Sequence, residues 1–70
     1  MMDIRFDIYD LDAKKESKVV VNTLLEALKK NHELKRENYT GAKRTIYDAW
    51  LTDLDNGIAL KLKFDDLMMF

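Results

Sequence analysis

The N-terminal segment alternates between apolar and polar residues. Ile4, Phe6 and Ile8 are each separated from the next by one charged residue, and successive residues of a strand point to opposite faces of a sheet. This two-residue period predicts a strand over residues 2–11 with one face in a core.

Residues 18–33 follow a longer period, with apolar side chains recurring so that they fall on one stripe of a 3.6-residue helix. The stripe consists of Val20, Val21, Leu24, Leu25 and Leu28. Ser17 precedes it, where a hydroxyl accepts from the open N–H groups of a first helical turn. The pattern predicts a helix from Lys18 to about Glu33, since the lower helix propensity of the three valines at 19–21 is small against the periodicity.

Residues 34–42 lose the period and contain Gly41, which predicts a loop. Over residues 44–54 both alternating sets are partly apolar, so helix and strand compete on periodicity. The turn sequence 55–57, Asp-Asn-Gly, decides for a strand, because it separates this segment from an alternating strand at 58–64 and Asn-Gly between apolar runs is a strong hairpin signal.

The hairpin register follows from the faces that it brings together. A two-residue turn would place Asp53 beside Leu60 on the apolar face, whereas a three-residue loop with Gly57 left-handed pairs Trp50 with Leu62. The second register is predicted. It gathers on one face the apolar residues Ile46, Trp50, Leu54, Ile58, Leu60, Leu62 and Phe64.

The predicted fold class is α+β: one domain, residues 1–70, with elements in the order β-α-β-β and a small three-stranded sheet that packs one helix on one face. The opposite face would carry Tyr9, Leu11, Tyr47, Ala49 and Leu51, with the apolar segment 67–70 as its only cover. An uncovered apolar patch of this kind marks an interface.

Composition narrows the class further. The 70 residues include no cysteine and no proline, and the formal net charge is −1. Without cysteine there is no disulfide framework, which favours a reducing, cytoplasmic setting. No run approaches the roughly 18 apolar residues of a membrane span, and no signal peptide is seen. A domain of this size buries only about 60% of its unfolded surface, so we expect a homodimer or a protein partner to add stability.

The residues offer little material for catalysis. Ser17 and His32 are the only serine and histidine, and the position four residues after His32, where a zinc motif needs a second histidine, holds Arg36. The acidic pair beginning at Asp53 resembles a calcium loop superficially, but Ile58 stands where that loop needs glycine. The sequence predicts no enzyme activity, no cofactor and no metal site.

Charge is unevenly distributed. Residues 29–44 contain six basic residues against two acidic ones, and the flanking segments are acidic. The basic residues are Lys29, Lys30, Lys35, Arg36, Lys43 and Arg44. With Tyr39 among them, they are candidates for weak, salt-dependent contacts with a nucleic acid. The alternative is that they form the solvated side of a helix and strand-edge charges that discourage aggregation.

These observations predict a small non-enzymatic protein-interaction module that binds and masks a partner protein, in the manner of the inhibitors that phages and mobile elements carry, and that forms a homodimer. The candidate interface consists of Tyr9, Tyr47, Leu51, Leu67, Met68, Met69 and Phe70. The segment 67–70 has the alternative role of closing the molecule's own core. The alternative function is a small nucleic-acid-binding or regulatory protein that uses segment 29–44.

Overall fold

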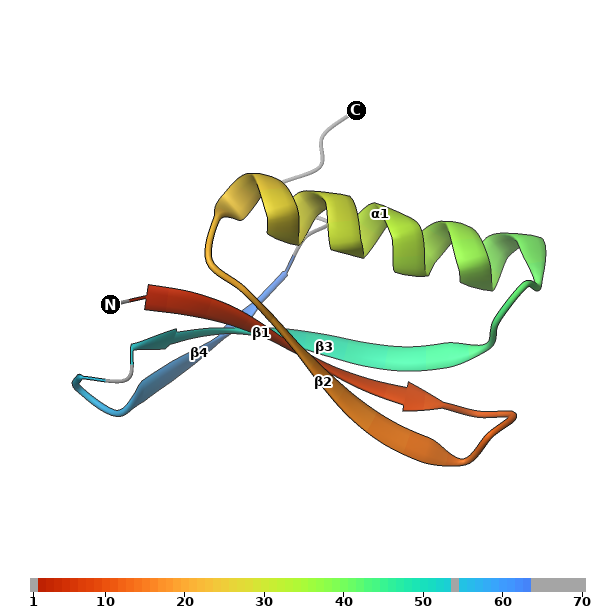
Figure 1. Cartoon of the computed structure of the whole chain (residues 1–70), viewed down its shortest axis with the longest axis horizontal. Helices are drawn as coiled ribbons and strands as arrows, with labels where there is room; N and C mark the ends of the chain where they lie inside the picture. The colour runs from red at the N-terminus through yellow and green to blue at the C-terminus, as the bar shows by residue number, and fades with distance from the viewer. Residues whose placement is uncertain (1, 54, 64–70) are drawn as a thin grey trace.

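The structure is a computed structural model that describes residues 2–53 and 55–63. One helix lies against a four-stranded antiparallel sheet whose strand order is β2-β1-β3-β4 (Figure 1). The elements along the chain are β1 (Met2–Asp10), β2 (Lys15–Val21), α1 (Leu24–Thr40), β3 (Thr45–Asp53) and β4 (Ile58–Leu62). The α+β class is confirmed, but the sheet has one strand more than predicted.

The additional strand is β2, which takes the first part of the segment predicted as a helix. Three consecutive β-branched residues fit a pleated surface better than a helix, and β1 offers them a partner. Val19 lies in register with Phe6, and Val21 with Ile4. Ser17 lies within β2, so its predicted role as a helix cap is wrong.

The helix begins and ends later than predicted. Thr23 is its N-cap, and the Thr23 hydroxyl accepts a hydrogen bond from the backbone N–H of Glu26 at 3.1 Å. Gly41 ends the helix in the left-handed conformation, with φ 81°, which glycine adopts without strain. The predicted loop at 34–42 is therefore mostly helical, and Leu34 continues the buried row that Ala27 and Asn31 begin.

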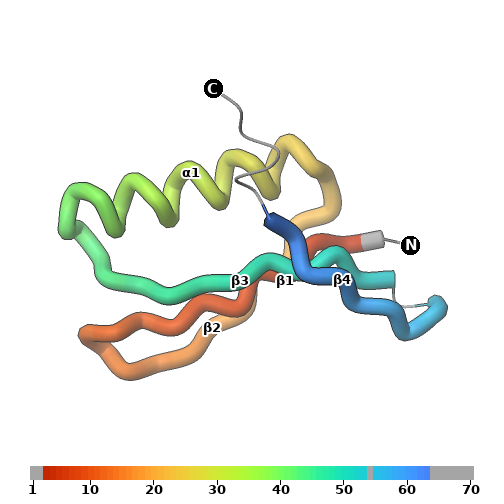
Figure 2. The backbone as a smooth tube through the Cα atoms, turned by 180° about the vertical axis from the view of Figure 1, so that it is seen from behind, coloured from red at the N-terminus to blue at the C-terminus, as the bar shows by residue number. Residues whose placement is uncertain are grey.

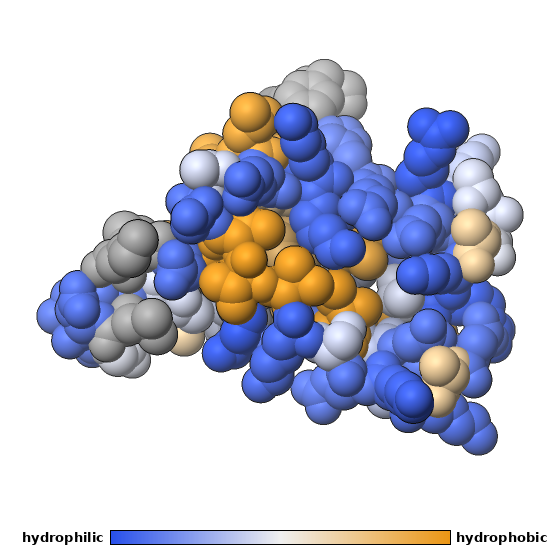
Figure 3. Space-filling view, in the orientation of Figure 1, coloured by the Kyte–Doolittle hydropathy of each residue, from blue (hydrophilic) through white to orange (hydrophobic). Residues whose placement is uncertain are grey.

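The helix covers one face of the sheet, and the core lies between these two layers (Figure 2). The buried apolar residues are Ile4, Phe6, Ile8, Ala27, Leu34 and Ala49. The core also contains one polar pair, because the Tyr47 hydroxyl donates a hydrogen bond to the carboxamide oxygen of buried Asn31 at 2.7 Å. At the β2 edge hydrophobic side chains remain visible between helix and sheet, surrounded by hydrophilic ones (Figure 3).

The face of β3 that meets the helix is the opposite of the predicted one. The β1–β3 register pairs Phe6 with Ala49 and Ile8 with Tyr47, which places Tyr47, Ala49 and Leu51 under α1. Ile46 and Trp50 consequently point away from the helix. The small Ala49 side chain is buried beneath the helix, and the Tyr47 hydroxyl reaches Asn31.

The β3–β4 hairpin is confirmed, but its register differs from the prediction by one residue. Asp53 pairs with Ile58, and Leu51 with Leu60. The Asp53 carboxylate accepts hydrogen bonds from the backbone N–H of Asp55 at 3.1 Å and the side-chain amide of Asn56 at 2.8 Å. These bonds lower the pKa of Asp53, that from Asn56 most. Gly57 is left-handed, as predicted, with φ 66°. Leu54 and Phe64, assigned above to the apolar face, lie outside the described residues.

Candidate functional site

The candidate site is the face of the sheet that points away from α1, which we call the open face. Side chains alternate along each strand, so the residues between the buried positions of β1 point to the open face, together with their neighbours in register on β2, β3 and β4. The open face includes Arg5, Asp7, Tyr9, Glu16, Lys18, Val20, Ile46, Asp48, Trp50 and Lys61. In the described part of the chain, the helix that covers the sheet lies on the other side (Figure 2).

Large apolar side chains on the open face are accessible to solvent. Val20 is 59% exposed on β2, Tyr9 41% on β1 and Ile46 61% on β3. Trp50 is half-buried, and its indole N–H is shielded from solvent and has no hydrogen-bond acceptor in the described part of the chain. Three adjacent strands thus contribute apolar groups to one surface, which is the usual composition of an interface patch.

Charged side chains stand between these apolar groups. Asp7 and Asp48 lie directly opposite each other on β1 and β3, where like charges are destabilising. Each has a basic partner on the open face. Arg5 Nε lies 3.0 Å from Asp7 Oδ1, and Lys61 Nζ lies 3.4 Å from Asp48 Oδ1. The two carboxylates are held side by side at the centre of the sheet by cations on either side.

The same face contains a hollow of about 320 Å³. Its lining residues are Asp7, Ile8, Tyr9, Glu16, Ile46, Asp48 and Trp50. Three of these carry carboxylates and two carry aromatic rings, and the lining includes no basic residue. Within residues 2–53 and 55–63, no group of three or more acidic or histidine side chains is arranged to hold a metal ion. The three carboxylates come from three adjacent strands, Glu16 from β2, Asp7 from β1 and Asp48 from β3.

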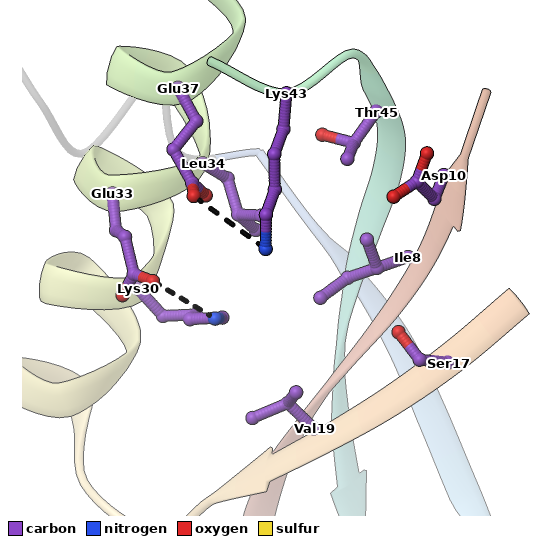
Figure 4. A pocket seen from close by; sticks show the side chains of 10 residues that line it. All are labelled: Ile8, Asp10, Ser17, Val19, Lys30, Glu33, Leu34, Glu37, Lys43 and Thr45. Atoms are coloured by element: carbon purple, nitrogen blue, oxygen red, sulfur yellow. Dashed lines mark hydrogen bonds and ion pairs between the residues drawn. The ribbon is translucent and has the colours of Figure 1, made fainter. Parts of the chain in front are cut away.

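A second, smaller cavity of about 150 Å³ lies between the C-terminal half of α1 and the sheet (Figure 4). Its charged side chains are engaged locally. Lys30 Nζ lies 3.5 Å from Glu33 Oε1, and Lys43 Nζ lies 3.9 Å from Glu37 Oε2. Asp10 accepts backbone hydrogen bonds from Ala13 and Asp12 across the β1–β2 turn, both at 2.9 Å. These bonds, that from Ala13 first, lower the pKa of Asp10. The cavity is thus lined by structural ion pairs and a turn.

The residues predicted as an interface do not lie together. Tyr9 is on the open face, as predicted, but Tyr47 and Leu51 lie on the face that α1 covers, so their assignment to the uncovered face is wrong. The predicted residues Leu67, Met68, Met69 and Phe70 lie outside the described residues. Val20, Ile46 and Trp50 were not among the predicted interface residues, because the sequence pattern assigned each of them to a core.

The predicted basic segment is divided between two places. Lys30 and Lys43 line the second cavity, and Arg44 donates from Nε and Nη2 to Asp12 Oδ1 at 3.0 and 2.7 Å. The hydrogen bond from Arg44 to Asp12 raises the pKa of Arg44. Lys29, Lys35 and Arg36 are exposed on α1. Lys30, Lys43 and Arg44 are therefore engaged in ion pairs with carboxylates.

Comparison with known proteins gives no match to a family model, a curated protein or a solved structure. Across the described ranges, no helix combines the length and the apolar character that crossing a membrane requires. The function of the open face therefore has to follow from its own chemistry.

Proposed function

We propose that this chain is a small non-enzymatic protein-binding module that docks a partner protein on the open face of its sheet. The observation that carries the proposal is the exposure of Val20, Tyr9 and Ile46 on three adjacent strands. Removing such side chains from water on association is favourable in proportion to their apolar area. Masking a partner's surface, as an inhibitor does, requires this kind of face and no catalytic group.

Ion pairs between the apolar groups support the same proposal. Arg5 lies in register between Val20 and Trp50, and its charge is offset by Asp7. Interface patches combine aromatic and aliphatic side chains with arginine in this way. A second copy of the chain is one partner that the open face could accommodate, and the homodimer is proposed on the same grounds.

The test is capture of partners by the immobilised full-length chain, with one variant on the open face and one elsewhere. Ile46→Glu places a charge on the open face, and we expect capture to fall at least tenfold, because an unpaired charge would be desolvated on docking. Tyr39→Glu is the matched control, since Tyr39 is 91% exposed on α1, and we expect its capture to equal that of the parent chain. Equal capture by all three proteins would refute docking at the open face.

Sedimentation equilibrium of the same proteins tests whether a second copy of the chain occupies the open face. We expect the parent chain and Tyr39→Glu to sediment as dimers at tens of micromolar, and Ile46→Glu as a monomer. A monomeric parent chain would exclude the homodimer and leave a different protein as the partner.

The second candidate function is nucleic-acid binding. Its support is the exposure of Lys29, Lys35 and Arg36 on one helix, although the ion pairs of Lys30, Lys43 and Arg44 reduce the charge available to phosphates. Capture that survives Ile46→Glu but disappears with nuclease treatment or added salt would assign the function to these basic residues.

A further inference from the structure

We infer that the hollow on the open face receives an arginine side chain of the partner, so that the partner presents a basic segment to this chain. The inference rests on the proposed docking at the open face and specifies the chemistry of what docks there. Three properties of the hollow carry it: its shape, its charge and the spacing of its carboxylates.

The walls of the hollow match the stem of a basic side chain. Tyr9, Ile46 and Trp50 offer apolar surface, and the methylene groups of arginine or lysine pack along such surface while their charged ends stay near polar groups. Aromatic faces also attract cations through the ring quadrupole. A volume of about 320 Å³ is sufficient for one such side chain and is open to the solvent side of the sheet.

The charge of the hollow selects a cation over an anion. Asp7, Glu16 and Asp48 line it without any basic residue. Asp7 and Asp48 are paired with Arg5 and Lys61, and Lys18 stands in register with Asp7, but none of these cations lines the hollow. Glu16 has no ion pair among the described residues. An incoming cation would relieve the like-charge contact between Asp7 and Asp48, whereas a phosphate would meet three carboxylates. The hollow is thus unsuited to a nucleic acid.

The spacing of the carboxylates favours arginine. They come from three adjacent strands, and a guanidinium presents several donors in a planar fork that reaches more than one carboxylate and stacks on aromatic rings. A lysine ammonium is a compact point charge that serves fewer of these groups at once. A basic segment with arginine as its central residue therefore fits the hollow best.

The experiment is an NMR titration of the isotope-labelled full-length chain with the blocked peptide acetyl-Gly-Arg-Gly-amide. Peptides with citrulline, lysine or glutamate at the central position are the comparators. We expect saturable shifts in the backbone amides of Tyr9, Glu16 and Ile46 and in the Trp50 indole N–H, with a dissociation constant on the order of millimolar. Lysine should bind more weakly, and citrulline and glutamate should give no saturable shift at these positions.

Variants assign the binding to the carboxylates. Glu16→Gln and Asp48→Asn should each weaken arginine binding about two- to fivefold, which is the range of exposed ion pairs. Glu33→Gln is the control, because Glu33 lies in the cavity on the helix side of the sheet, and it should leave the titration unchanged. Equal binding of the citrulline peptide, shifts located elsewhere, or indifference to both open-face variants would overturn the inference.

A negative result of this experiment can be distinguished from a negative result in the test of the proposed function. Partner capture that is lost in Ile46→Glu but unaffected by Glu16→Gln and Asp48→Asn would retain docking at the open face and reject the arginine. Capture that is unaffected by Ile46→Glu would reject docking at the open face, whatever the peptide titration shows.

Discussion

The two faces of the sheet are built from alternate residues of the same strands, yet they differ in almost every physical property. On β1, Phe6 is completely buried under α1, while its neighbours Arg5 and Asp7 form an ion pair on the open face. Among the described residues, those buried between the sheet and α1 are apolar apart from Asn31, which accepts a hydrogen bond from Tyr47. The open face mixes aromatic rings, aliphatic groups and charges.

The difference shows that core packing explains the residues of the covered face but not those of the open face. Packing under the helix accounts for Phe6, Ala27 and Ala49, which leave little exposed surface. Packing does not account for placing Asp7 opposite Asp48, since like charges in this position weaken a sheet even though Arg5 and Lys61 each pair with one of them. A feature that costs stability without improving packing is expected where a surface serves binding.

The largest expected loss of stability comes from a substitution on the covered face. Phe6→Ala removes the central ring of the core and should lower the free energy of unfolding by about 3–5 kcal/mol, enough to unfold most of the population of so small a domain. Ile46→Ala on the open face should change it by no more than about 0.5 kcal/mol. Urea unfolding followed by circular dichroism measures both. Similar losses in the two variants would contradict the contrast between the faces.

A smaller effect tests the polar pair within the covered face. Tyr47→Phe removes the hydroxyl that donates to Asn31 and should cost about 1–3 kcal/mol, because a buried acceptor loses its donor. Asn31→Leu removes the acceptor of the same hydrogen bond and should cost a similar amount. The double variant should be less destabilised than the sum by about 1 kcal/mol. Strict additivity in the same urea experiment would mean that the two side chains act independently.

The smallest effect concerns the helix that distinguishes the two faces. Thr23→Ala removes the N-cap and should lower the free energy of unfolding by about 1 kcal/mol. Hydrogen exchange should become faster at the Glu26 amide, which donates to the Thr23 hydroxyl. Ser17→Ala, at the exposed position predicted as the cap from the sequence, should change stability by less than about 0.5 kcal/mol. The reverse order of the two losses would place the start of the helix at Ser17.

Local signals in the sequence predicted the elements that have one dominant pattern. The strict alternation of Ile4, Phe6 and Ile8 predicted β1, and Gly57 predicted the hairpin between β3 and β4. The valines at 19–21 were misread because Val20 and Val21 also fit a helical stripe with Leu24. Their assignment to β2 depends on pairing with β1, which is a tertiary contact.

The open face was harder to predict because β3 is apolar on both sides. The predicted hairpin register grouped Ile46 and Trp50 with the apolar residues of the 58–64 strand and therefore placed them in the core. The structure instead places buried Ala49 and half-buried Tyr47 beneath the helix, where the Tyr47 hydroxyl donates to Asn31. The position of Asp48 on β3, facing the same way as Ile46 and Trp50, was the signal that this side is not a core.

The central place of β1 in the sheet also predicts an order of events in folding. One edge of β1 pairs locally with β2, across a short turn, but its other edge pairs with β3, where Asp10 faces Thr45 and Met2 faces Asp53. Closing such distant contacts is slow compared with forming a hairpin or a helix. Until β3 arrives, a partly folded chain presents the open backbone edge of its own central strand, and during that interval any other extended segment can take the position that β3 later fills.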